Sequence, residues 1–525
     1  MNRTALIIML CLFICSYTPG FAQAVNLPLD HWAYEFLERM ETRGFYRYLG
    51  GRTLPLSRTE IAKIFIDIEE SQKNNAQKKL SATERALLEQ FKSEFSEELL
   101  LLEHKQLPGT GERHLFTWRE DDNTIHADFD IEQILDIKKG EQYDPTERLS
   151  HTTLGGALRG RLKGSLGFHI RVRNTMHRGM TETKGNFDPS KGLPLNLTGK
   201  SFYSDEAIAY FVWKLPWFEL EVGRDNAKWG PGYRGSLVLS AENPLFDMIK
   251  LKAQFRRFQF TSIHGNLNSS LGQKYIAAHR LELKVCPWLF VAGSEAVIYG
   301  NRGIEFQYLN PLMPYHVAEH HLGDLDNNTM GFDIAAFPLQ NLKTYFELFL
   351  DDYTLSKNPF TYYGNKFAFL AGGAWVDPFG LENSEFRLEY ARLEPWVYTH
   401  KDTINIYENY NQSIGHWLGP DADDWFAEIN YRPIRDLKFT FSFERVRNSP
   451  ATITESYNRL LGERKHFLSG IIEHQRTFGF KISDQLFRDT FLSLSIFYVH
   501  TKNVQNTENQ NSRDTLASFE FKMNY

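Results

Sequence analysis

Hydrophobic and polar positions follow two different periods along the chain, and the period changes near residue 112. Between residues 28 and 105, apolar side chains recur every three to four positions, which predicts amphipathic helices. From about residue 112, segments of about ten residues alternate apolar with polar or small side chains, which is typical of strands in a membrane barrel. The sequence therefore predicts a small helical region followed by a large β region.

Three helices are predicted in the first region. Asp30 can cap a helix from about His31 to Arg43, which carries an apolar side chain every four residues on one face. Ser57 and Ser81 each begin a capping box with a glutamate three residues later, so a helix should start at each of them. Because every helix presents one apolar stripe, we expect the three helices to pack as a bundle.

Connections in the β region alternate between short turns and long polar segments. The short turns are expected at residues 215–217, 286–288, 337–339, 377–380 and 432–435. The long segments lie near residues 175–201, 353–363, 399–421, 449–466 and 503–513. Outer-membrane barrels have short periplasmic turns and long outer loops, so both ends of this barrel should lie in the periplasm and the strand number should be even, about 16 to 18.

Aromatic residues mark the expected membrane boundary. An inner aromatic girdle beside the short turns should include Trp213, Trp217, Trp288, Phe337, Phe379 and Tyr431. At the C-terminus, Phe519, Phe521, Met523 and Tyr525 alternate with polar residues, and an aromatic end to such a strand is typical of bacterial outer-membrane barrels. A soluble β-sandwich or propeller is the alternative, but a propeller should repeat every 40 to 50 residues or so, and no such repeat is found. We therefore expect a mainly β protein, a transmembrane antiparallel β-barrel.

The first residues predict export. Arg3, the apolar run from Ala5 to Cys15 and the sequence Ala22-Gln23-Ala24 form the three parts of a secretory signal peptide. Cleavage after Ala24 would leave Cys286 as the one cysteine, so no internal disulfide is expected. The expected domains are a signal peptide at 1–24, a periplasmic helical bundle at 25–110 and an outer-membrane barrel at 111–525.

Composition excludes several classes of protein. The 525 residues have a net charge of -6 and a mean hydropathy of -0.42, and 14% of them are aromatic. The mild acidity argues against nucleic-acid binding, and the polar average argues against a bundle of membrane helices. With 42% hydrophobic residues, the chain is not disordered. A barrel fits, because its polar lumen and loops dilute the apolar band.

Residues 223–244, GRDNAKWGPGYRGSLVLSAENP, form the densest motif. The Gly-Pro-Gly sequence within it cannot continue a regular strand. One interpretation is a saccharide site, since aromatic faces stack on sugar rings and planar charged groups bind hydroxyls or acidic substituents. The other, which spacing alone favours, is an inward fold that braces the lumen, with Arg224 and Asp225 neutralising one another. The candidate saccharide-binding residues here are Arg224, Asp225, Lys228, Trp229, Tyr233 and Arg234.

Other clusters of charged and histidine residues indicate a function less specifically. The segment from His316 to Asp326 contains metal-capable residue types, but HEXXH is absent and we expect a solvated loop. A basic cluster, Arg171, Arg173, His177, Arg178 and Lys184, could attract an anionic polymer, face lipopolysaccharide or line the lumen. No nucleophile elbow, P-loop or Rossmann pattern is present, so the sequence predicts neither an enzyme nor a cofactor or metal site.

The motif KWGPGYRGSLVLSAENP resembles the signature of the Wzi-type capsule assembly proteins. Further matches follow in order, and the most specific of them is GHWLGPDADDWF at 415–426. It adds Trp417, Asp421 and Asp424 to the candidate saccharide-binding residues. The N-terminal helices also fit the family, so the resemblance spans nearly the whole chain after residue 24.

The resemblance implies an outer-membrane barrel of about 18 strands with a periplasmic three-helix bundle. It also implies a lectin-like role in holding capsular or extracellular polysaccharide on the cell surface. The expected partners are that polysaccharide, outer-membrane lipid and lipopolysaccharide, and other components of polysaccharide export. A porin or uptake channel is the alternative function for a barrel of this size. The helical region also resembles surface-layer-homology modules, which bind cell-wall polymers.

Overall fold

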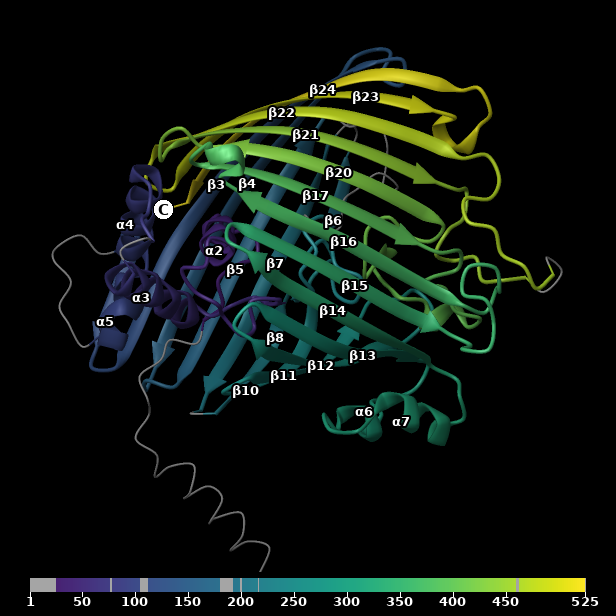
Figure 1. The fold of residues 1–525 in the computed structure, drawn as a ribbon, viewed down its shortest axis with the longest axis horizontal. Helices are drawn as coiled ribbons and strands as arrows, with labels where there is room; N and C mark the ends of the chain where they lie inside the picture. Colours follow the sequence, from purple (N-terminus) through teal and green to yellow (C-terminus); the bar gives the residue numbers. More distant parts are fainter. Residues whose placement is uncertain are drawn as a thin grey trace, which may run out of the picture.

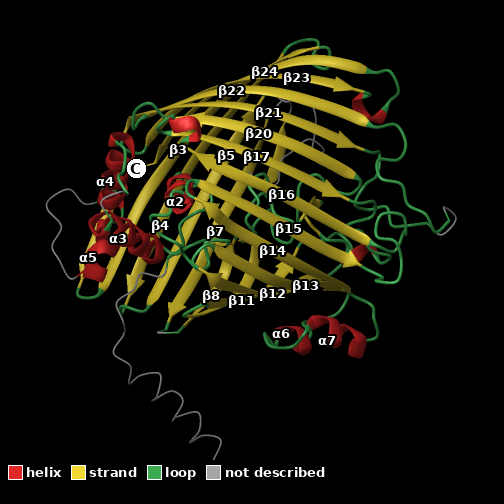
Figure 2. Ribbon diagram, in the orientation of Figure 1, coloured by secondary structure: helices red, strands yellow, loops and turns green. Residues whose placement is uncertain are grey.

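A computed structural model describes residues 25–75, 78–103, 112–179, 192–198, 201–215, 217–458 and 462–524. The predicted signal peptide lies outside these residues. A single closed β-barrel forms most of the structure, four helices gather at one end of it, and two more helices lie against its outer wall (Figure 1, Figure 2). No helix among the described residues is long and apolar enough to cross a membrane.

The N-terminal helices form the predicted bundle. They are α2 (Ala33–Thr42), α3 (Arg58–Asn74), α4 (Ala82–Glu94) and α5 (Ser96–Glu103). Both capping boxes are present, at Ser57 and at Ser81. The predicted third helix is divided at Phe95 into α4 and α5. The predicted cap at Asp30 was wrong: Trp32 occupies the N-cap of α2, and the Asp30 carboxylate pairs with cations of the barrel wall instead.

Eighteen antiparallel strands close the barrel, which confirms the predicted fold class. They are β3 (Asn123–Gly140), β4 (Glu147–Leu162), β5 (Leu166–Arg178), β7 (Ser201–Lys214), β8 (Phe218–Asp225), β10 (Phe246–Phe255), β11 (Phe258–Leu267), β12 (Lys274–Cys286), β13 (Leu289–Gly300), β14 (Asn327–Leu339), β15 (Leu342–Asp352), β16 (Lys366–Val376), β17 (Ser384–Leu393), β20 (Ala422–Tyr431), β21 (Leu437–Asn448), β22 (Glu473–Phe487), β23 (Thr490–Lys502) and β24 (Asn511–Asn524). The barrel closes where β24 pairs with β3, and two short strands, β2 (Phe116–Glu120) and β6 (Leu193–Thr198), pair at its ends.

Period-two alternation sorts the side chains between lipid and lumen. Leu135 and Ile137 of β3 and Phe519 of β24 are exposed on the outer face. Inward-facing positions carry charged groups that pair along the inner wall, such as Arg173 of β5 with Asp130 of β3. Because lipid contains no partner for unpaired backbone groups, a closed sheet with this apolar outer band is a transmembrane barrel of the outer membrane.

Short turns and long connections alternate as predicted. β12 joins β13 through residues 287–288, and β20 joins β21 through residues 432–436, whereas β17 and β20 are separated by residues 394–421. Trp217 and Trp288 are exposed beside short turns, as expected of a girdle. Phe337 is not part of it: the side chain is buried in the lumen, where the Arg47 guanidinium lies 4.0 Å from its ring centroid.

The helical bundle is inserted into the periplasmic end of the barrel and is held there by ion pairs. Glu38 of α2 accepts hydrogen bonds from Lys343 (2.5 Å) and Arg387 (3.0 Å) of the wall. Arg39 pairs with Asp377 in a periplasmic turn at 2.5 Å. The bundle has its own apolar core, which includes Phe36, Met40, Ile61, Phe65, Phe91 and Phe95. The bundle is therefore packed around its own core and contacts the wall largely through charged side chains.

Candidate functional site

Two outer connections fold into the lumen. Residues 226–245 join β8 to β10, and residues 394–421 join β17 to β20. Their apolar side chains form one core with the inner wall, in which Trp229, Leu237 and Tyr398 are buried. The densest sequence motif therefore braces the lumen, which is the interpretation that its spacing favoured.

Carboxylates of the barrel wall hold the first of these loops. Glu347 on β15 accepts the backbone N–H groups of Gly232 (2.7 Å) and Leu237 (2.8 Å). Glu389 on β17 accepts two N–H groups from the residues between them, at 2.7 and 2.8 Å. These four backbone N–H groups would otherwise be buried without a partner, so the hydrogen bonds fix the path of the loop within the lumen.

The Gly-Pro-Gly bend explains why glycine is needed here. Gly230 has φ +128°, and a Cβ atom at this position would lie 2.3 Å from a carboxylate oxygen of Glu347. Its N–H donates to the carbonyl of Arg52 in the bundle at 2.9 Å. Beside it, β9 (Lys228–Trp229) pairs with β1 (Thr53–Leu54). The loop and the bundle thus meet inside the barrel and fill its centre together.

The second loop is bonded to the first by tyrosines. The Tyr398 hydroxyl donates to the carbonyl of Leu237 at 2.7 Å, and the Tyr407 hydroxyl donates to that of Val238 at 2.8 Å. Both tyrosines are completely buried and stack on one another, with ring centroids 5.4 Å apart. The two loops are therefore one packed unit at the outer end of the lumen.

A cleft of about 370 Å³ lies on the outer side of this unit. The loops contribute Arg234, Glu242, Trp417 and Leu418, and the outer ends of β21 and β22 contribute Glu444, Val446, Asn448, Glu473 and Gln475. One aromatic face surrounded by amide, carboxylate and guanidinium groups suits a ligand with both apolar ring faces and many hydroxyls.

Arg234 and Trp417 lie next to one another in the lining of the cleft. The Arg234 guanidinium is bonded to the Glu444 carboxylate and lies 5.7 Å from the centroid of Trp417. Trp417 is 38% exposed, so part of its ring is open to a ligand. A fixed cation beside an exposed indole can hold a polar ligand in one orientation within the cleft.

His416 supports Trp417 from below. The His416 ring is completely buried and stacks on the indole, with centroids 5.6 Å apart. Burial and the nearby Arg234 lower the pKa of His416 to about 3. The imidazole is therefore neutral at pH 7, and its protonation would place a second positive charge next to Arg234.

The structure brings only part of the predicted site together. Arg234 and Trp417 line the cleft, and Asp424 lies next to it with one buried carboxylate oxygen that has no hydrogen-bond partner among the described residues. Tyr233 lies on the lumen side, where its hydroxyl donates to Glu428 at 2.9 Å. Asp421 is buried and accepts the Leu468 N–H at 2.6 Å, which fixes an outer loop.

The remaining predicted residues have structural contacts. Trp229 is only 1% exposed, and the Lys228 ammonium donates to the Gly232 carbonyl at 2.5 Å. Arg224 and Asp225 point to opposite faces of β8 and do not neutralise one another. Arg224 pairs with Asp247 at 2.7 Å on the outer rim, whereas buried Asp225 accepts a hydrogen bond from Asn26.

Sequence reasoning missed the wall residues of the cleft. Glu444, Asn448, Glu473 and Gln475 occupy inward positions at the ends of two strands. Their alternation is that of any lumen-facing polar residue, so no sequence signal separated them from the rest of the wall.

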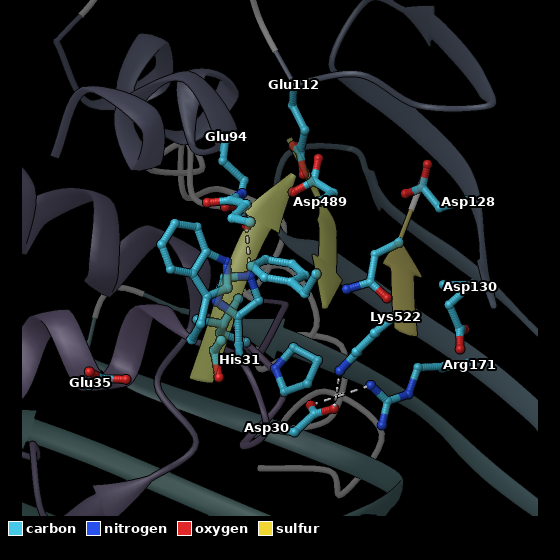
Figure 3. A pocket seen from close by; sticks show the side chains of 18 of the residues that line it. Asp30, His31, Glu35, Glu94, Glu112, Asp128, Asp130, Arg171, Asp489 and Lys522 are labelled. Atoms are coloured by element: carbon cyan, nitrogen blue, oxygen red, sulfur yellow. Dashed lines mark hydrogen bonds and ion pairs between the residues drawn. The ribbon is translucent and has the colours of Figure 1, made fainter. Parts of the chain in front are cut away.

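Two further cavities, of about 420 and 350 Å³, lie between the bundle and the wall and share Asp30, Arg171 and Lys522. Figure 3 shows Asp30 between these two cations, at 3.5 and 3.4 Å, with His31 beside Glu94. Burial would raise the pKa of Glu94, but His31 and Arg58 lower it. These charged groups belong to the contact between bundle and barrel.

The basic and histidine-rich clusters have defined positions. Arg171 and Arg173 line the lumen, and Lys184 lies outside the described residues. The segment from His316 to Asp326 was expected to be a solvated loop, which was wrong, because most of it forms a helix on the outer wall. Among the described residues, no group of three or more His, Cys, Asp or Glu side chains is placed to hold a metal ion.

Fold and cleft together define an outer-membrane β-barrel whose lumen is filled from both ends and which presents a polar, aromatic cleft to the outside. Residues 139–516 match the family model described as capsule assembly protein Wzi, and the chain belongs to this family. The resemblance seen in the sequence is confirmed.

One solved structure shares the fold over nearly the whole chain. Wzi of Escherichia coli, described as an outer-membrane protein involved in group 1 capsule assembly and a carbohydrate-binding β-barrel, is 16% identical with a TM-score of 0.63, and the match covers 96% of this chain and 99% of that one. OccAB4 of Acinetobacter baumannii is 11% identical with a TM-score of 0.46, and the match covers 76% of this chain and 98% of that one. No curated protein sequence matches this chain.

Proposed function

We infer that this protein binds a cell-surface polysaccharide at its outer cleft and helps to assemble or retain capsular or extracellular polysaccharide there. Membership of the capsule assembly family supports this role, as does the description of the Escherichia coli relative as carbohydrate-binding. The observation that carries the assignment to the cleft is the exposed Trp417 ring among amide and carboxylate groups.

Trp417 supplies the stacking face, and Arg234 supplies the cation. The nearby Glu444, Asn448 and Gln475 offer acceptors and donors for sugar hydroxyls. These groups orient a bound saccharide without acting on it, so the proposed activity is binding and not catalysis. Tyr233 and Asp421 position the loops around the cleft.

The occupied lumen supports binding over transport. The bundle enters from the periplasmic end, two loops fold in from the outer end, and β1 pairs with β9 where they meet. We therefore expect low single-channel conductance in a planar bilayer. A large, stable open pore would favour the porin alternative.

The cleft is tested by titrating the purified protein with oligosaccharides cut from the surface glycan of its own host. Trp417→Ala should weaken binding about tenfold, because a tenfold change corresponds to ~1.4 kcal/mol and a lost stacking face accounts for an effect of this size. Trp425→Ala is the matched control, since Trp425 is similarly exposed but lies on the outer face of the barrel. Unchanged affinity in the Trp417 variant would remove the cleft as the site.

The cellular role needs its own experiment. Deletion of the gene should release polysaccharide from the cell surface into the medium, and the wild-type protein should restore retention. Trp417→Ala should restore it only in part. If deletion leaves the polysaccharide attached to the cells, the proposed role is wrong whatever the protein binds in solution.

A further inference from the structure

Helices α6 (Phe306–Leu309) and α7 (Tyr315–Leu322) form a hairpin between β13 and β14. The hairpin folds back along the outside of the barrel (Figure 1). Its inner side packs on the wall, with Tyr308, Tyr315 and Ala318 buried against Ala277 and Val297. Its position is therefore fixed by a small core of its own, separate from the loops that fill the lumen.

The hairpin covers polar groups that would otherwise face the membrane. Glu295 on β13 points outward and pairs with His279 on β12 at 3.0 Å. Its carboxylate also accepts the backbone N–H groups of Tyr315 (2.8 Å) and His316 (2.6 Å) at the start of α7. A carboxylate turned toward lipid is costly, and these bonds satisfy it beneath the hairpin.

Next to the His279–Glu295 pair, the outward side chains of β12 and β14 face lipid. Leu281 and Leu283 follow His279 on the outward face of β12, and Phe332 and Ile334 occupy the outward face of β14. All four are exposed apolar side chains. The hairpin therefore interrupts the apolar band of the barrel at its outer edge.

The outer surface of the hairpin carries large exposed apolar side chains, next to the exposed His316, His320 and His321. Phe306 is 83% exposed and Leu312 is 81% exposed, and Leu309 and Val317 are exposed beside them. Four large apolar side chains on one short segment are unusual for a surface in water. These side chains extend the lipid-facing band over the hairpin, which covers His279 and Glu295 of the wall.

We propose that the α6–α7 hairpin is a membrane-interface element, which inserts Phe306, Leu309, Leu312 and Val317 among the acyl chains of the outer-leaflet lipid. Continuity with the lipid-facing strands identifies the partner, because a surface that lies beside the apolar band of a barrel meets the same solvent as that band. Burial of the four side chains in lipid stabilises the hairpin against the wall, as for other interfacial helices.

The depth of the hairpin can be measured by spin labelling. Phe306→Cys and Leu312→Cys, each in a Cys286→Ser background, are labelled with a nitroxide and reconstituted in phosphatidylcholine vesicles. Collision rates with oxygen, which dissolves in lipid, and with a water-soluble nickel chelate then report the surroundings of each label. Heat-modifiable migration checks that each variant is folded, and Leu309→Cys or Val317→Cys replaces one that is not.

Two matched positions calibrate the result. Leu283→Cys lies in the lipid-facing band, and Leu355→Cys lies in an outer loop at 92% exposure. The oxygen-to-nickel ratio at the hairpin should match that of Leu283 and exceed that of Leu355 by about tenfold. A ratio like that of Leu355 would overturn the proposal. A label shielded from both reagents would also overturn it, since a protein partner or a second copy would then cover the hairpin.

Discussion

The two ends of the lumen are closed by different chemistry. At the periplasmic end, a bundle with its own apolar core docks through ion pairs such as Glu38 with Lys343 and Arg387. At the outer end, two loops share an apolar core with the wall. Glu347 and Glu389 hydrogen-bond the first loop, and tyrosines of the second loop bond it to the first. The periplasmic closure is thus a docked unit, whereas the outer closure is part of the barrel fold and can position a binding cleft rigidly.

The largest effect is expected from filling the space at Gly230. In Gly230→Val, the Cβ atom would approach the Glu347 carboxylate closely and the backbone would keep a φ that favours glycine. Strain and overpacking together should cost about 2–5 kcal/mol, measured by urea unfolding in lipid vesicles, and saccharide binding should be lost. Gly303→Ala is the control, because a Cβ atom there meets nothing within 4 Å. Equal stability of the two variants would show that the outer loop is not tightly packed.

The two ends of the lumen should lose stability at different pH values. The folded pKa of His416 is about 3, below its ordinary value near 6.5, so the unfolded chain binds more protons and stability falls as pH drops from about 6.5 to 3. The loss is at most about 1.4 kcal/mol per pH unit. The free energy of unfolding, measured by urea unfolding in lipid vesicles, should therefore fall between pH 7 and 5, and His416→Gln should flatten that profile. An unchanged profile in the variant would exclude His416 as its source.

The bundle should respond only at lower pH. Burial would raise the pKa of Glu35, but Lys438 and Arg432 lower it to about 2, and Lys252 does the same for Glu60. Lowered carboxylate pKa values give stability above about pH 4.5 that is lost as pH falls toward 2. Limited proteolysis of the bundle should thus increase only below about pH 4.5. Release of the bundle at pH 6 would mean that other groups hold it.

Loss of one carboxylate, Glu38, should affect the periplasmic end moderately. Glu38→Gln leaves Lys343 without its carboxylate partner on α2 and should weaken docking of the bundle by about 1–3 kcal/mol. Faster proteolysis of residues 25–103 should report this, with saccharide binding unchanged. Glu69→Gln is the matched control, because Glu69 pairs with Lys92 inside the bundle. The same increase in both variants would show that the bundle unfolds instead of undocking.

The smallest effect is expected outside both closures. Arg224 pairs with Asp247 on the exposed outer rim, and exposed pairs of this kind contribute about 0–1 kcal/mol. Arg224→Ala should leave stability and saccharide affinity nearly unchanged in the same titration. A clear loss of affinity would extend the binding surface from the cleft to the rim.

Local signals in the sequence predicted most of the N-terminal helices and the barrel strands, but not helix α7. The capping boxes at Ser57 and Ser81 and the alternation of β24 predicted helices and strands that the structure contains. The site was predicted less well, because Arg234 and Trp417 lie in the cleft while Trp229 is buried. Residue types that bind sugar also suit a packed loop, so composition could not separate the two uses.

By itself, the sequence determined the period of each segment, the turns between strands and an even strand number of about 16 to 18. These features depend on neighbouring residues and on the need of each strand to face both lipid and water. Only the tertiary structure decided which loops enter the lumen, how the bundle docks and which wall residues line the cleft. Those contacts join residues such as Gly232 and Glu347, which are 115 positions apart. Their meeting depends on closure of the whole barrel, which no local pattern records.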